Sequence, residues 1–229
     1  MDGGRSRRSF FSPSVQQPPG HPLDGRETHL LHIRAAEAQF RLATAVRLAV
    51  TMERQPLDLP LQWSHGHHAV TYAEIALSKD EADFAAWTLQ RSATLLMASS
   101  ALEAIKIVFP NPKTHADPNV VAAYQITRMI RIAFAHKPFD PGWRIDPDCR
   151  DRRFEVPGVL LLDTTNLDGK PFDWRHYGGP LSLLRLSRFV RLILLGDTTP
   201  PEKVIPLPAE VYYQQGDLIL RRVRDLPGE

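Results

Sequence analysis

Residues 78–108 read SKDEADFAAWTLQRSATLLMASSALEAIKIV, and this stretch predicts the longest helix of the chain. Its first residues fit a capping box, with Ser78 as the N-cap and Glu81 three residues later. Apolar residues then recur at helical spacing, and the prolines at 110 and 112 end the pattern. A helix of roughly thirty residues would be about 45 Å long. The stretch therefore favours a mainly helical fold.

Three further helices are predicted around this one. The first spans about residues 28–54, where prolines at 56 and 60 end it. The third begins at the cap Asp117, with Pro118 in the first helical position, and ends at His136. The fourth opens at Pro180 and closes at Gly196. Because a short link joins the second and third helices, we expect an up-and-down four-helix bundle over residues 26–196.

The remaining segments have a different character. Residues 142–176 contain short extended runs separated by Pro, Asp and Gly, and NLDGK at 166–170 is typical of a hairpin turn. They predict a small β insertion before the last helix. Residues 1–25 are rich in Pro, Gly and Ser and are predicted to be a disordered tail. A C-terminal extension, 197–229, holds a second candidate hairpin, VYYQQGDLILRRV.

Composition narrows the class of protein but does not name a function. The chain has 229 residues, 43% of them hydrophobic, and a formal net charge of only +2, which by itself does not indicate a nucleic-acid binder. One cysteine, Cys149, lies in a polar stretch and excludes an internal disulfide, which fits the cytoplasm. No targeting segment and no membrane-spanning run is found. We therefore expect a cytoplasmic protein with no membrane association.

The candidate catalytic motif is RIAFAHKPFDPGW, residues 131–143. Arg131 and His136 match R-x4-H at the end of a predicted amphipathic helix, and Lys137 precedes a proline that ends it. Spacing alone is weak support, because Arg26 and His32 fit R-x5-H as well. That second pair straddles the start of the first helix, so only the pair at 131 and 136 has a suitable context.

In this motif and in its predicted architecture the chain resembles the HEPN superfamily. The architecture covers about residues 28–195, and the motif covers about 131–143. The resemblance implies an all-α bundle that pairs as a homodimer and a metal-independent ribonuclease without a cofactor. It also implies that RNA is the substrate and that an antitoxin or a defence protein is a partner.

Carried over from the family, Arg131 binds the scissile phosphate and His136 acts as general acid or base. RNA supplies its own nucleophile, the 2′-hydroxyl, so the enzyme moves protons and stabilises charge. Histidine titrates near neutrality, and arginine donates two parallel hydrogen bonds to phosphate. Arg128 and Lys137 would enlarge the positive patch and contact RNA. On an ideal helix, positions five apart differ by about 140° and 7.5 Å, so the turn at Pro138 has to reorient His136.

One departure keeps a second interpretation open. Many active members of the family carry Asn or Asp directly after the motif arginine, where this chain has Ile132. The alternative is a non-catalytic HEPN-like scaffold that binds RNA, a nucleotide or a protein. In that case Arg131 would pair with Glu103 or another acid of the bundle, and Ile132 would pack in the core.

Other clusters favour structural roles. The histidines of WSHGHH could bind a metal, but an exposed loop is the favoured interpretation, since no carboxylate or cysteine completes a ligand set. Arginines that recur every third residue of the last helix indicate either a basic stripe for RNA or a solvated helix face. Aromatic residues of the insertion either stack on bases or form its small core. These three sets are His65, His67 and His68; Arg185, Arg188 and Arg191; and Trp143, Phe154, Trp174 and Tyr177.

Overall fold

The computed structural model describes residues 25–52, 62–71, 77–135, 137–200, 211–215 and 218–222. Four α-helices account for most of this part of the chain, and their bounds lie close to the predicted ones. They are α1 (Gly25–Thr51), α2 (Lys79–Val108), α3 (Pro118–Ala135) and α4 (Pro180–Leu194). The predicted mainly helical fold is confirmed. Gly25, the last residue of the predicted disordered tail, is the first residue of α1. Residues 1–24 lie outside the described part.

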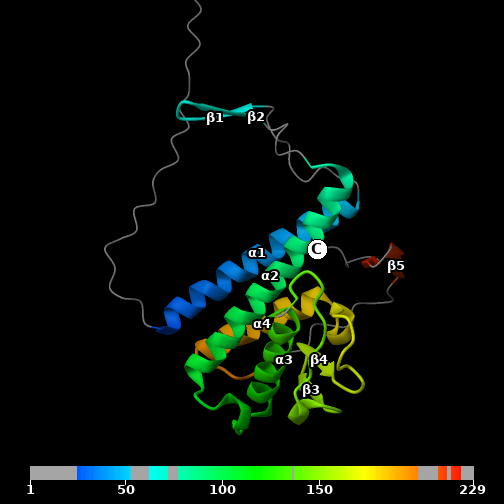
Figure 1. Ribbon diagram of the computed structural model, residues 1–229. Helices are drawn as coiled ribbons and strands as arrows, with labels where there is room; N and C mark the ends of the chain where they lie inside the picture. The colour runs from blue at the N-terminus through cyan, green and yellow to red at the C-terminus, as the bar shows by residue number, and fades with distance from the viewer. Residues whose placement is uncertain are drawn as a thin grey trace, which may run out of the picture.

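The helices pack together with α2 at the centre (Figure 1). α2 contacts α1, α3 and α4, and α1 also contacts α4. The largest fully buried side chains come from all four helices and from the insertion. They include Phe40, Phe134, Phe189 and Trp143. One buried polar link crosses the core between α1 and α4. Glu37 of α1 accepts a hydrogen bond of 2.9 Å from the Ser187 hydroxyl and lies 3.1 Å from Arg191 Nε.

The start of α2 confirms the predicted capping box. Glu81 N donates to the Ser78 hydroxyl at 3.3 Å, and Ser78 N donates to the Glu81 carboxylate at 2.9 Å. The Ser78 hydroxyl also donates to this carboxylate at 2.7 Å, and this bond, together with the one from Ser78 N, lowers the pKa of Glu81 because both favour the charged carboxylate. The start of α3 also follows the sequence, since the Asp117 carboxylate accepts from Asn119 N at 2.8 Å.

The β insertion contains one antiparallel hairpin, formed by β3 (Arg153–Val156) and β4 (Leu160–Asp163). Phe154 pairs with Leu162, and both are buried against the helices, with β3 on α3 and β4 on α4. Figure 1 shows the insertion beside α3. The expectation of a small β element before the last helix is therefore confirmed.

The predicted hairpin turn at 166–170 is wrong. The hairpin closes instead through residues 157–159, where Gly158 has φ 72°. The NLDGK segment forms a separate turn, with Asn166 at φ 52° and Gly169 at φ 78°. Its Asp168 accepts hydrogen bonds from Ile145 N at 2.9 Å and from Arg150 at 2.8 Å. Both segments have residues suited to a left-handed conformation, and only the pairing of strands distinguishes them.

Two more hairpins complete the strands that the structure describes. β1 (Gln62–His65) pairs with β2 (His68–Thr71), and β5 (Val211–Gln215) pairs with β6 (Leu218–Arg222). The second hairpin agrees with the candidate seen in the C-terminal extension. The first corrects the expected WSHGHH loop. Gly66, at φ 61°, begins its two-residue turn, a position at which glycine meets little steric cost.

Candidate functional site

Arg131 lies on the solvent-facing side of α3, four residues before the helix ends at Ala135. Its neighbours Ile130, Ala133 and Phe134 are buried, so the helix turns one apolar face to the core and leaves Arg131 exposed. Among the residues that the structure describes, no hydrogen bond or ion pair engages the guanidinium. The expected pairing with Glu103 is wrong, because Glu103 binds Lys106 at 3.1 Å. Arg131 is therefore free to meet an anion from solvent.

His136, the second residue of the motif, lies outside the described residues, so its general acid–base role stays a prediction. Lys137 is exposed, and its carbonyl accepts a hydrogen bond of 3.2 Å from Asp140 N in the turn that follows the motif. Ile132 is half-buried. It is neither the core residue expected of the scaffold nor a fully exposed position.

Arg128, one turn before Arg131, is held by the β insertion. Its Nε donates to Gln125 Oε1 at 3.0 Å, and its other nitrogens form an ion pair with Asp146 and a 3.4 Å contact with Cys149 Sγ. Asp148 lies 3.8 Å away and also pairs with Lys113 at 2.5 Å. Burial acts to lower the pKa of Arg128, but the carboxylates outweigh it and the pKa is raised. Arg128 anchors the segment 146–149 to α3, and RNA contact through it stays a prediction.

Cys149 lies in a polar stretch of the sequence, yet its side chain does not reach the surface. It is fully buried between α3 and the insertion. Burial raises the pKa of the thiol, and the adjacent Arg128 opposes this shift. Since the neutral thiol is favoured, Cys149 acts as a small core residue.

The turn after the motif leads directly into the core of the insertion. Gly142 N donates to Ala133 O at 3.3 Å, and the buried Trp143 follows it. The Trp143 ring lies 5.1 Å from the Phe172 ring and 6.4 Å from the Tyr177 ring, centroid to centroid. Trp143, Phe154 and Tyr177 are at most 5% exposed. The core interpretation of these three aromatic residues is confirmed, whereas Trp174 is only partly buried.

Trp143 makes the fold sensitive to the protonation of one histidine. Trp143 Nε1 donates to His176 Nδ1 at 2.9 Å, which requires the neutral imidazole at that nitrogen. Burial lowers the pKa of His176, and Asp173 partly opposes this. Below about pH 6.5 the unfolded chain therefore binds a proton that the folded chain resists. We expect the free energy of unfolding to fall as the pH drops through this value.

Urea unfolding of the wild type and of His176→Gln, measured above and below about pH 6.5, checks this expectation. Glutamine keeps an acceptor and does not titrate, so its stability should change less over the same interval. Carboxylates with lowered pKa values, such as Asp148, lose their contribution at more acidic pH and do not interfere. An identical pH dependence in both proteins would contradict the role of His176.

Sequence reasoning missed Arg91 on α2. Its guanidinium carbon lies 3.6 Å from the centre of the Trp87 ring and 6.0 Å from that of Trp174. Arg91 Nε is buried and has no hydrogen-bond partner. The only signal in the sequence was the spacing of Trp87 and Arg91, four residues apart on one helix. The second ring, Trp174, comes from the insertion and lies more than eighty residues away in the chain.

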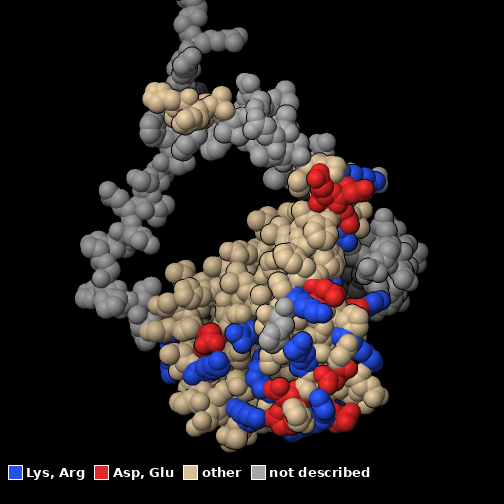
Figure 2. Space-filling model, in the orientation of Figure 1, with Lys and Arg blue, Asp and Glu red and all other residues tan. Residues whose placement is uncertain are grey.

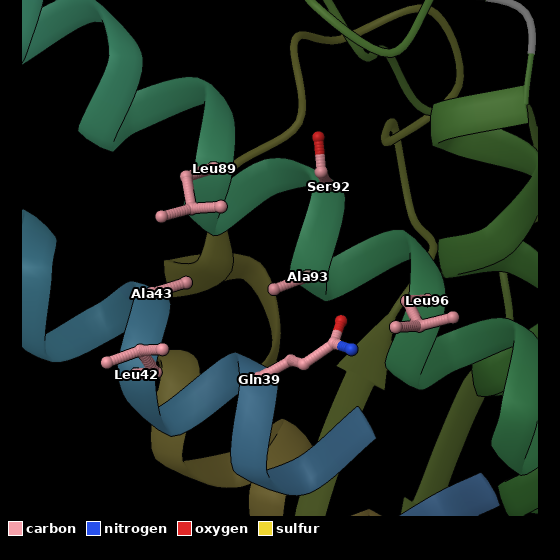
Figure 3. Close-up of a pocket in the computed structure, with 7 residues that line it drawn as sticks. All are labelled: Gln39, Leu42, Ala43, Leu89, Ser92, Ala93 and Leu96. Carbon is pink, nitrogen blue, oxygen red and sulfur yellow. The ribbon is translucent and has the colours of Figure 1, made fainter. Parts of the chain in front are cut away.

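A groove between α1 and α2 holds about 310 Å³ and is lined by apolar and uncharged side chains (Figure 3). Leu42 of α1 and Leu89 and Leu96 of α2 border it, and all three are exposed. Gln39 and Ser92 are the polar residues at its walls. Since none of its lining residues titrates near neutrality, the groove offers no acid–base chemistry.

The structure bears on the arginines of α4 and on the histidines of WSHGHH. Arg191 pairs with Glu37, Arg188 is exposed and Arg185 is half-buried, so α4 does not present three equivalent arginines. His65 and His68 are register partners in the β1–β2 hairpin. Within the described ranges, no group of three or more His, Cys, Asp or Glu could hold a metal ion. None of the helices described is both long and apolar enough to cross a membrane.

Charged side chains are mixed rather than segregated. Figure 2 shows basic and acidic residues interspersed over the region that Figure 1 fills with α3 and the insertion. Ion pairs such as Arg150–Asp168 and Arg153–Glu155 belong to this region. An anionic ligand would therefore meet individual unpaired arginines and not one continuous basic face.

Comparisons of the chain with protein-family models, with curated proteins and with solved structures found no match.

Proposed function

We propose that the chain is a HEPN-like, metal-independent endoribonuclease that acts as a homodimer. The observation that carries the proposal is the exposed Arg131 near the end of α3, which pairs with no described residue and is followed in the sequence by His136, within a packed set of four helices. The four helices would correspond to the up-and-down bundle of that superfamily. An exposed arginine without an acidic partner keeps its donors available for phosphate.

The chemistry assigned to the pair needs no metal. The 2′-oxygen of a ribose attacks the adjacent phosphorus while the bond to the 5′-oxygen breaks. His136 takes the proton from the 2′-hydroxyl or gives one to the leaving 5′-oxygen. Arg131 donates hydrogen bonds to the phosphate oxygens, on which charge accumulates in the transition state. The products are a 2′,3′-cyclic phosphate and a 5′-hydroxyl.

The dimer supplies what one chain lacks in this proposal. Two copies related by a two-fold axis would place two arginines and two histidines around one cleft. Lys137, exposed beside the motif, would add to the positive charge there. A role in bacterial defence or in a toxin–antitoxin pair, with an antitoxin or defence protein as the partner, belongs to the same proposal.

The second candidate is a non-catalytic scaffold of the same fold that binds RNA, a nucleotide or a protein. The observation in its favour is Ile132, a half-buried apolar residue directly after the motif arginine. Arg128 adds to this, since Asp146 and Asp148 already engage it. The two candidates differ in whether RNA is cut.

The test is incubation of the purified chain with a mixed single-stranded RNA in EDTA. We expect cleavage to products with cyclic phosphate ends, read by mass spectrometry. An all-2′-O-methyl strand of the same sequence should remain intact, because it lacks the nucleophile. Cleavage that depends on added divalent metal, or equal cutting of the methylated strand, would contradict the mechanism. Binding without cleavage would support the scaffold.

A further inference from the structure

Two indole rings from separate elements enclose the Arg91 guanidinium. Trp87 lies one turn earlier on α2, with its ring centre 3.6 Å from the guanidinium carbon. Trp174 begins η4 (Trp174–Tyr177) in the insertion, and its ring centre is 6.0 Å away. Stacking of this kind uses the flat face of a guanidinium and leaves its edge, which carries the N–H groups, available.

The edge of Arg91 is unused in the part of the chain that the structure describes. No hydrogen bond or ion pair joins it to another described residue, and its Nε is buried without a partner. Trp174 Nε1 is a second buried donor without a partner. Buried donors that stay unpaired cost free energy, and native structures rarely leave them so. Two such donors at one place indicate a site that awaits an acceptor.

The neighbouring charges leave this edge open. Burial lowers the pKa of the Arg91 guanidinium, and Asp140 and Asp173 partly oppose this because they favour its charged form. Asp173 is already engaged by Arg175, whose backbone N donates at 2.8 Å and whose Nε donates at 2.7 Å. Neither carboxylate forms an ion pair with Arg91. Lys170 and Arg175 act on His176, and neither of them affects the pKa of Arg91.

An aromatic surface extends from the same point. Phe84, which is 61% exposed, stacks on Trp87 with ring centres 6.0 Å apart and planes at 28°. Unpaired bases of single-stranded RNA stack on such rings, and their phosphates bind arginine. Oxyanion acceptors and flat aromatic groups occur together in a nucleotide, and the Phe84–Trp87–Arg91–Trp174 cluster can receive both.

We propose that this cluster binds one nucleotide of a single-stranded RNA, with its phosphate on the edge of Arg91 and its base on the exposed ring of Phe84. The proposal rests on the function proposed above for the choice of RNA as ligand. Asp140, which acts on Arg91, belongs to the turn that directly follows His136. The cluster therefore positions the strand beside the motif, and Arg91 is a positioning residue.

The test measures binding without cleavage. Anisotropy of a fluorescein-labelled, all-2′-O-methyl single strand of about twelve nucleotides is compared for wild type, Arg91→Met and Arg34→Met. Arg34 is exposed on α1, so its loss removes the same charge away from the cluster. We expect Arg91→Met to weaken binding about tenfold or more and Arg34→Met to weaken it by about twofold or less. Equal effects, or no binding by the wild type, would overturn the proposal.

Thermal unfolding separates ligand binding from a structural role. Methionine fills similar space without an unpaired buried cation, so Arg91→Met should unfold at the same or a higher temperature than the wild type without RNA. A lower unfolding temperature with unchanged RNA affinity would show that Arg91 only fastens the insertion to α2. If Arg91→Met does not fold, Arg91→Lys keeps the charge but loses the planar fork. It should still lose most of the affinity, and full affinity would count against the site.

Failure of this inference and failure of the proposed nuclease give different results. If Arg91→Met still cleaves RNA and binds the strand with unchanged affinity, the nucleotide site is refuted and the nuclease proposal stands. If binding depends on Arg91 but unmodified RNA is not cleaved, the nuclease proposal is refuted and the nucleotide site stands.

Discussion

Replacement of His136 by alanine is expected to slow RNA cleavage by about 10²–10⁴-fold, the range that a positioned general acid or base contributes. Replacement of Arg131 by alanine should cost about 10²–10³-fold, as loss of one donor to a developing oxyanion does. Arg131 is exposed and forms no hydrogen bond or ion pair through its side chain with a described residue, so its substitution should leave the fold intact. The assay is single-turnover cleavage of a labelled RNA in EDTA, with circular dichroism to verify folding.

Matched controls for this experiment lie on α1. His32 and Arg34 are both exposed there, and neither belongs to the motif. Their alanine variants remove the same residue types and should retain cleavage within about twofold, the scale of a single distant surface charge. If the motif variants cut RNA as fast as these controls, the assignment of the pair as catalytic would be wrong, and the scaffold would replace the nuclease.

Trp143→Ala should destabilise the protein by about 3–5 kcal/mol, which is the usual cost of truncating a buried large aromatic residue. Trp143 is 1% exposed and lies among Phe172, Tyr177 and His176. Its backbone also binds the 169–170 turn, since Trp143 N donates to Lys170 O at 2.8 Å and Gly169 N donates to Trp143 O at 2.9 Å. Little nearby can collapse into the space without breaking this pairing.

The measurement is equilibrium unfolding in urea followed by circular dichroism. Trp143→Phe provides the graded control, because it keeps one aromatic ring and loses the hydrogen bond to His176 and part of the buried ring volume. It should cost less, about 1–2 kcal/mol. Substitutions at surface positions usually change the free energy of unfolding by less than about 1 kcal/mol. A loss of that size for Trp143→Ala would show that this residue does not organise the insertion.

The helix ends followed from local chemistry. Ser78 and Glu81 cap α2 through bonds between residues three apart, and Pro118 takes the first position of α3. Such signals act within one turn of chain, so they are visible in the sequence. The exposure of Arg131 agrees with the apolar period of α3, but the sequence alone had left a pairing with an acid of the bundle open.

The misplaced hairpin shows where local signals end. Residues 157–159 and 166–170 both contain the glycine that a tight turn favours, and neither reveals which strands will pair. Pairing depends on which face packs against the helices, and Phe154 and Leu162 decide it by their burial on α3 and α4. The WSHGHH segment is a second case, where a hairpin formed in place of the expected loop.

By itself, the sequence determined the number and order of the four helices, their approximate ends and the place of the β insertion. These depend on periodicity and capping, which act between residues near one another in the chain. Only the tertiary structure decided that Arg128 is held by Asp146, that Cys149 is buried and that Arg91 lies between Trp87 and Trp174. Each of these contacts joins a helix to another element of the chain, and in all three that element is the insertion. The free energy of such contacts comes from burial and charge pairing across elements, so no local pattern encodes them.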